Sequence, residues 1–134
     1  MNIEEKISSE ARKIMAEEIA EAGGCEVFFR GILNENKIVD EVEVLAKGNK
    51  YSVPAILKRM RKTEIVIHNH PSGYLYPSDA DVEIASVFAN KMDGGSYIID
   101  NNAENIYVIT EAYFEENKKI DIKPYFEKNG LLAQ

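Results

Sequence analysis

The sequence predicts an α/β domain in which a mixed β-sheet is flanked by helices. Three observations predict this class. Segments with helical spacing of apolar residues are interspersed with short segments of strand type, in the order αββαβαββ. The 134 residues suit one domain with one core. A hydrophobic content of 45% argues for a folded chain and against disorder.

The first predicted elements are a long helix and a β-hairpin. Residues 3–22 carry apolar side chains at helical spacing and a pair of glycines follows them, so we expect one amphipathic helix across this range. Residues 26–33 are rich in β-formers and residues 38–47 alternate in polarity, which predicts two paired strands joined by a turn at 34–37. The apolar face of the helix consists of Ile3, Ile7, Ala11, Ile14, Met15, Ile19 and Ala22.

The second half of the chain predicts two further helices and three further strands. Residues 64–68 form a compact apolar run, which predicts a central strand buried on both faces. The domain is predicted to cover residues 1–111, and residues 112–134 to form a helix, a tail or a linker. The other expected elements are a short helix from Ser52 to about Lys62, a loop at 69–77, a helix from Ser78 to about Met92, and strands at 96–100 and 105–110.

Composition bears on the class of partner. The net charge of -7 and the pI near 4.9 argue against a domain that grips nucleic acid through phosphate contacts. The densest positive run, at 58–62, is interpreted as a solvated helix end, with contact to a polyanion as the alternative. No apolar stretch approaches the ~20 residues of a membrane span. The charged N-terminus and the single cysteine lead us to expect a cytoplasmic protein.

Both histidines of the chain, His68 and His70, stand at the end of the apolar run 64–68. Residues two apart in a strand point to the same side, and Asp81 follows in the first turn of the next predicted helix. Two imidazoles and a carboxylate are ligands that zinc accepts, and three protein ligands leave a fourth position for water. Two alternatives stand beside this prediction. An HxH pair alone does not specify a metal, and Ser78 with Asp81 forms an S-x-x-D pattern that would serve as a capping box.

These residues also resemble a family signature. His68, His70, Pro71, Ser78 and Asp81 are spaced as in the JAB/MPN (JAMM) zinc metallopeptidases. The wording HNHPSG…PSDAD is most similar to the bacterial RadC-like branch, and a looser resemblance extends from about residue 24 to residue 110. The resemblance implies a cytidine-deaminase-like sandwich around a mixed sheet.

The resemblance also implies a role for each motif residue. His68, His70 and Asp81 would bind one zinc ion, and Ser78 would stabilise the oxyanion. A glutamate from an earlier strand would take the proton from the zinc-bound water. We assign this role to Glu26, which opens the strand after the long helix.

The alternatives for this role are Glu41 and Glu43. They alternate with valines, so we expect them on the solvent-exposed face of a half-buried strand. The sequence after Glu26, VFFRG, departs from the most familiar form of the family. The assignment of the base to Glu26 therefore depends on the order of the predicted elements.

The neighbours of the motif carry weaker predictions. Tyr74, Leu75 and Tyr76 are predicted to line a substrate groove, with packing over the adjacent helix as the alternative. Cys25 is predicted to be an inert core residue, with a fourth metal ligand or a redox role as the alternatives. Asn69 points away from the ligands if strand alternation holds, and either supports the site or has a turn or surface role.

The predicted function is therefore zinc-dependent hydrolysis of an amide or isopeptide bond. The family resemblance implies peptide or protein-tail substrates, such as ubiquitin-like or sulfur-carrier tails. The alternative is a non-catalytic recognition or docking module attached to a DNA-repair or helicase protein. Direct binding of nucleic acid by this domain is not expected, because the chain is acidic.

Overall fold

The fold is described by a computed structural model that covers residues 2–48, 56, 58–61, 63–79, 81 and 96–109. The helices expected at 52–62 and 78–92 lie largely outside these residues. The tail expected at 112–134 lies entirely outside them. Within the described part of the chain, no helix has the length and apolar character needed to cross a bilayer.

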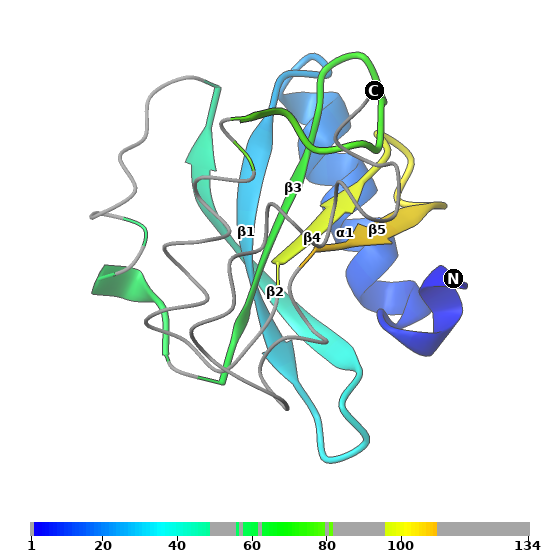
Figure 1. Ribbon diagram of the computed structural model, residues 1–134, viewed down its shortest axis with the longest axis vertical. Helices are drawn as coiled ribbons and strands as arrows, with labels where there is room; N and C mark the ends of the chain where they lie inside the picture. Colours follow the sequence, from blue (N-terminus) through cyan, green and yellow to red (C-terminus); the bar gives the residue numbers. More distant parts are fainter. Residues whose placement is uncertain are drawn as a thin grey trace.

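The described residues form a five-stranded mixed sheet with strand order β2-β1-β3-β4-β5 (Figure 1). β1 pairs antiparallel with both β2 and β3, β3 runs parallel to β4, and β4 pairs antiparallel with β5. The mixed α/β sheet predicted from the sequence is thus confirmed, and β3 is central and buried throughout as expected. The strands are β1 (Val27–Leu33), β2 (Val39–Lys47), β3 (Ile65–Asn69), β4 (Ser96–Ile99) and β5 (Ile106–Val108).

The single N-terminal helix predicted at 3–22 is wrong, because two helices occupy this range. A short 3-10 helix η1 (Ile3–Glu5) is followed by the α-helix α1 (Ser9–Glu21). Between them, the chain forms a bridge to Val39, whose backbone N–H donates to the Lys6 carbonyl at 2.8 Å and whose carbonyl accepts from the Ser8 N–H at 2.9 Å. The Ser8 hydroxyl then accepts from the Ala11 N–H at 3.2 Å and so caps α1.

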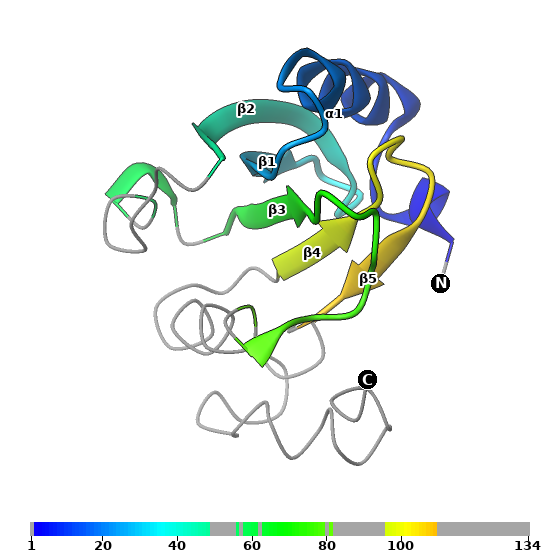
Figure 2. The ribbon, with the colours of Figure 1, turned by 90° about the horizontal axis from the view of Figure 1, so that it is seen from above.

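One face of the sheet is covered by α1, and the larger apolar cluster of the described residues lies between them (Figure 2). Ile14 was predicted to face this core but is 45% exposed, whereas the neighbouring Met15 is fully buried. The buried residues of α1 are Ala11, Met15 and Ile19, and Ile14 lies about 100° around the helix from Met15, at the margin of the apolar stripe. The buried cluster includes Ile7, Ala11, Met15, Ile19, Val27, Phe29, Val39, Ile65, Ile67, Tyr97 and Ile99.

On the opposite face of the sheet, the described residues form an apolar cluster of Phe28, Ile56 and Val66. Along β3, Ile65 and Ile67 belong to the α1 side and Val66 belongs to the opposite side, as strand alternation requires. By the same alternation His68 follows Val66 onto the opposite face. The candidate site is therefore built on the side of the sheet that α1 does not cover.

Candidate metal centre

The candidate site lies at the edge of the sheet that is formed by strand ends, where the central strand β3 finishes. Strands of opposite direction bring different parts of the chain together there. β3 and β4 are parallel and end at this edge, whereas β1 is antiparallel to β3 and begins there. Phe28 of β1 pairs with His68 of β3, and continuing this register by two residues places Glu26 opposite His70. The sheet register thus delivers a carboxylate and two imidazoles to one location.

Four side chains meet at this edge. Glu26, His68, His70 and Asp81 each offer a ligand atom, and these atoms lie within 4.8 Å of one another. The Nε2 atom of His68 is 3.0 Å from Oδ1 of Asp81, and Nε2 of His70 is 2.6 Å from Oδ2 of the same carboxylate. The side chains of His68 and Asp81 are only 2% and 6% exposed. The histidines and the aspartate therefore share one focus, as the spacing led us to expect.

Neighbouring groups fix the orientation of both imidazoles. Nδ1 of His70 is 2.7 Å from the carbonyl oxygen of Tyr74, which can only accept, so Nδ1 carries the proton and donates it. Nε2 is thereby turned toward Asp81, the arrangement that outer partners impose on metal-binding histidines. The His68 ring stacks on Phe28 with a centroid distance of 4.8 Å and an interplanar angle of 15°. Its Nδ1 atom is buried and has no hydrogen-bond partner among the residues that the structure describes.

Asp81 is held by its own backbone segment as well as by the histidines. The Ser78 N–H donates to Oδ2 of Asp81 at 2.9 Å, and the Asp81 N–H donates to the Ser78 hydroxyl oxygen at 3.1 Å. These are the two reciprocal hydrogen bonds of a capping box. The capping role and the contact with the histidines therefore coexist in one carboxylate. Because the exposed Ser78 hydroxyl accepts from Asp81, its own proton remains available to a further acceptor.

The surroundings of Asp81 and Glu26 shift the pKa values of these two carboxylates in opposite directions. Burial alone would raise the pKa of Asp81, but hydrogen bonds from His68, His70 and Ser78 hold that pKa well below its usual range. Burial raises the pKa of Glu26 above that of an ordinary glutamate, against the opposing attraction of His68. The hydrogen bond to Asp81 raises the pKa of His70, although burial opposes it. Asp81 is thus the permanent anion, and Glu26 is the carboxylate better suited to exchange a proton.

The two rival glutamates lie elsewhere on the sheet. Glu43 of β2 forms ion pairs with Arg30 at 3.2 Å and with Arg59 at 2.8 Å. Glu41 is exposed on the same strand, opposite Ile32. Within the described ranges, the group of potential ligands that contains the histidines includes Glu26 and neither rival. The catalytic role assigned to Glu26 nevertheless stays a prediction.

Two neighbours of the motif differ from the sequence prediction. Cys25 is exposed in the coil before β1, so its assignment to the core is wrong. Asn69 is 0% exposed within β3, so the turn or surface alternative is wrong. Its side-chain Oδ1 accepts from the Val27 N–H at 2.8 Å, and its Nδ2 donates to the Cys25 carbonyl at 3.2 Å and to Oδ1 of Asn101 at 2.9 Å.

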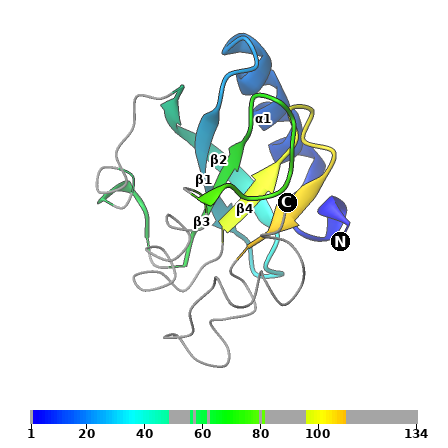
Figure 3. The same ribbon diagram turned by 45° about the horizontal axis from the view of Figure 1, so that its top comes forward.

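Asn101 was not singled out from the sequence. It lies in the turn between β4 and β5, and its Nδ2 donates to the Pro71 carbonyl at 3.0 Å. Figure 3 shows this turn, in yellow, beside the green loop that leaves β3. The sequence signal for Asn69 is an amide at the end of an apolar run beside the predicted ligands, whereas Asn101 is marked only by its place after the strand predicted at 96–100.

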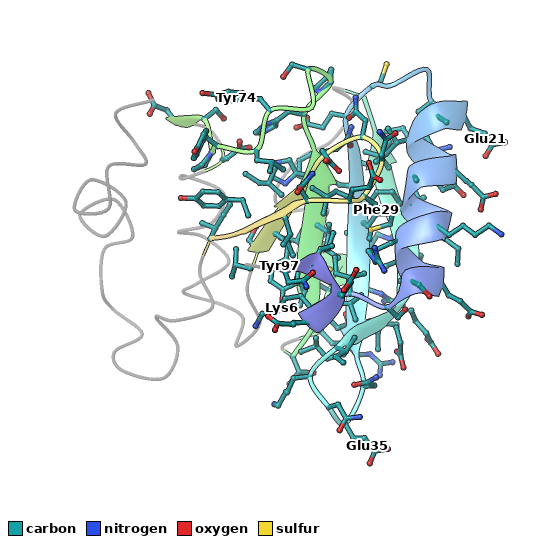
Figure 4. The ribbon with its side chains drawn as sticks, turned by 90° about the vertical axis from the view of Figure 1, so that its right-hand side faces the viewer. Lys6, Glu21, Phe29, Glu35, Tyr74 and Tyr97 are labelled. Carbon is teal, nitrogen blue, oxygen red and sulfur yellow. The ribbon has the colours of Figure 1, made fainter. Side chains whose placement is uncertain are left out.

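The predicted groove residues lie on the loop between the ligands. Tyr74 is 52% exposed and lies on the side of the sheet away from α1 (Figure 4). Its ring meets that of Tyr76 edge to face at 5.4 Å, and Tyr76 meets Tyr107 in the same way at 5.8 Å. Leu75 between them is partly buried. The groove stays a prediction, and its alternative, packing over the helix expected at 78–92, falls on residues outside the described part.

The donor set fits a divalent metal ion. Two imidazole nitrogens and one carboxylate, with a second carboxylate nearby, are ligand types that suit zinc and related transition metals better than calcium or magnesium. The orphaned Nδ1 of His68 shows that this ring's polar contacts are directed through Nε2 toward the shared focus. A cation at this focus would be held by His68, His70 and Asp81.

Two comparisons place these features among other proteins. Residues 6–93 match the RadC-like JAB domain family, a segment that contains all four potential ligands and Ser78. A UPF0758 protein of Finegoldia magna is 31% identical over 74 residues, which are 48% of this chain and 33% of that relative. The matched segment is thus about a third of the relative's length.

Proposed function

The chain belongs to the RadC-like JAB domain family, and from this premise we propose that it is a zinc-dependent hydrolase that cleaves an amide or isopeptide bond. One observation carries the proposal. Two imidazoles and two carboxylates converge within 4.8 Å, and their environments push the pKa values of the carboxylates in opposite directions. Pairs of titratable groups separated in this way are typical of catalytic sites.

In the proposed site, His68, His70 and Asp81 hold the zinc ion. When bound, zinc supplies a Lewis acid that polarises a carbonyl oxygen and acidifies water. The protein's contribution is orientation. Tyr74 fixes one imidazole through its carbonyl, Phe28 supports the other by stacking, and the capping bonds from Ser78 keep the carboxylate of Asp81 in place.

Glu26 moves the proton in the proposed reaction. Its raised pKa lets it accept a proton from the attacking water and deliver that proton to the leaving nitrogen. The water oxygen bonds to the carbonyl carbon, the C–N bond breaks, and the products are a carboxyl group and an amine. The Ser78 hydroxyl donates to the oxyanion that forms on the way, a contribution of about 2.7–4 kcal/mol in comparable sites.

The proposed substrate is an extended peptide or protein tail. Tyr74 and Tyr76 support this proposal, because they are exposed on the loop that joins the ligands. Exposed aromatic side chains are common where peptides dock. The net charge of -7 supports a protein substrate over a nucleic acid.

The test begins with the metal content of the purified chain. We expect one zinc per chain by elemental analysis, and loss of that zinc in His68→Ala. Turnover is then measured with an internally quenched peptide library and with a ubiquitin-like protein joined through an isopeptide bond. Glu26→Gln should keep the zinc and lose turnover by about 10²–10⁴-fold, the usual contribution of a general base.

The matched control for this test is Glu41→Gln, which makes the same change on an exposed strand position and should leave turnover intact. A chain that contains no stoichiometric zinc, or whose zinc content is unchanged by His68→Ala, would end the proposal.

A second candidate function is a recognition module attached to a DNA-repair or helicase protein. It is favoured by the length of the matched segment, which is only about a third of the curated relative, so further regions accompany such a domain there. A recognition module would show no turnover in the wild type, and its Glu26→Gln variant would keep its zinc and its binding partner.

A further inference from the structure

We infer that Asn69 is a positioning residue that holds Glu26 in place over the metal ligands. The inference rests on the proposed function of the site. Asn69 does not touch the group of ligands, because strand alternation directs its side chain to the α1 face while His68 and His70 serve the opposite face. It acts through the backbone of β1 instead.

The side chain of Asn69 binds both peptide groups that flank Glu26. Its Oδ1 accepts from the Val27 N–H, and its Nδ2 donates to the Cys25 carbonyl. The first of these groups follows the Cα atom of Glu26 and the second precedes it. Together they fix the backbone angles of Glu26, and therefore the direction in which its carboxylate leaves the strand.

The chemistry of the partners fixes the orientation of the Asn69 amide. A backbone N–H can only face an oxygen, and a backbone carbonyl can only face a donor, so a flipped amide would lose both contacts. Asn101 adds a third bond from the opposite side, and its own Nδ2 is occupied by the Pro71 carbonyl. The start of β1, the loop after β3 and the β4–β5 turn are thereby joined through two amides.

No other natural side chain of this size can replace the amide. Aspartate at position 69 would keep an acceptor for Val27 but would present a second acceptor to the Cys25 carbonyl. Alanine would remove the partner of the buried Val27 N–H and that of the partly buried Cys25 carbonyl, and a buried N–H without a partner is costly. The residue between the two histidines thus contributes to the site as a backbone clamp.

The test compares Asn69→Ala with Asn105→Ala in the full chain. Asn105 is an exposed asparagine in the β4–β5 turn whose Nδ2 donates to Asp100, and among the described residues its side chain bonds neither Asn69 nor Asn101. In the metal-free protein, NMR would follow amide hydrogen exchange at Val27 and the ¹³C shift of the Glu26 carboxyl. In the zinc-loaded protein, chelator competition would give the zinc affinity, and the peptide or isopeptide probe would give kcat and KM.

For Asn69→Ala we expect Val27 exchange to accelerate about tenfold, as the loss of one ordinary hydrogen bond allows. The Glu26 carboxyl shift should change, whereas the zinc affinity should stay within about threefold because the ligands remain. The value of kcat should fall by about 10–100-fold with little change in KM, as a misplaced catalytic group produces. Asn105→Ala should behave as wild type.

Asn101→Ala is the second variant, because it removes only the outer support and should show the same changes at smaller size if Asn69→Ala does not fold. The inference is overturned if the Glu26 shift is unaltered in both variants, or if zinc affinity falls as steeply as kcat, which would mark a purely structural residue. A wild type with no turnover would refute the proposed function alone, since the exchange rate and the carboxyl shift would still decide the place of Asn69.

Discussion

The two faces of the sheet differ in what they contribute. Among the described residues, the face covered by α1 holds the larger cluster of buried apolar residues, and the opposite face holds the cluster around Phe28 and the group of potential ligands. Strand β3 serves both faces, with isoleucines on one side and histidine on the other. In the described part of the chain, the larger apolar cluster and the potential metal ligands therefore lie on opposite sides of this five-residue strand.

Two neighbouring phenylalanines, one on each face of the sheet, give the largest expected effects. Phe29 belongs to the α1 cluster and Phe28 stacks on His68, and both are fully buried. Phe28→Ala and Phe29→Ala should each cost about 3–5 kcal/mol of unfolding free energy. Only Phe28→Ala should also weaken zinc binding, by about tenfold, because it frees the His68 ring.

Urea unfolding of the metal-free chain and chelator competition in folded samples measure the two quantities separately. Equal weakening of zinc binding by Phe29→Ala would show that the faces are not independent.

The second prediction concerns the pH dependence of zinc affinity, which should arise from the face of the sheet that carries the potential ligands. Zinc must displace a proton from His70, whose pKa is raised by Asp81, so zinc affinity should fall as the pH falls from above 6.5. The expected slope is about tenfold per pH unit for each proton displaced. Zinc affinity measured between about pH 5 and pH 8 checks the slope. An affinity that does not change with pH would contradict the displacement of a proton.

The metal-free chain should show a different pH dependence of stability. The contribution of His70 to the free energy of unfolding is fully present below pH 6.5 and is lost as the pH rises through the raised pKa of this residue. The contribution of Asp81 is present above 3.8 and is lost as pH falls through the lowered pKa. The His70–Asp81 pair therefore stabilises the metal-free site in mildly acidic solution, where zinc binds less well. Melting temperatures with and without zinc test this opposition.

The smallest effect is expected at Glu43, on the exposed edge strand. Its ion pairs with Arg30 and Arg59 involve partly exposed side chains, and such pairs contribute about 0–1 kcal/mol. Glu43→Gln should therefore leave turnover and zinc affinity unchanged and lower stability by no more than this amount. Thermal unfolding and the peptide assay check the two expectations. A loss of turnover would transfer the role of base from Glu26 to Glu43.

The sheet could be predicted from the sequence because its strands are short apolar segments bounded by polar or turn residues. The strand predicted at 64–68 is displaced by one residue from β3, and the hairpin strands begin one residue later than expected. The N-terminal helix failed for a tertiary reason. Its helical spacing continues through Ile7, but Val39, far along the chain, recruits the backbone around that residue into a bridge. Periodicity within one segment carries no information about such a partner.

The candidate site divides in the same way. The histidines and Asp81 are close in sequence, so strand alternation and helix-start chemistry bring them together locally. Glu26 is distant in sequence, and only the register of β1 on β3 separates it from Glu41 and Glu43. Asn69 was placed on the correct face by alternation, but its partners at 25, 27 and 101 exist only in the folded sheet.

The contact of Asp81 with both histidines has a consequence for how a cation would enter. It closes the chain between residues 70 and 81 into a ring made of backbone and hydrogen bonds. The entropy lost in closing such a ring grows only slowly with its length, and here that loss is incurred during folding. At a bound cation, the two imidazoles and Asp81 would exchange their contacts with one another for contacts with the ion. Because the ligands are already close together, binding would require little rearrangement of this loop.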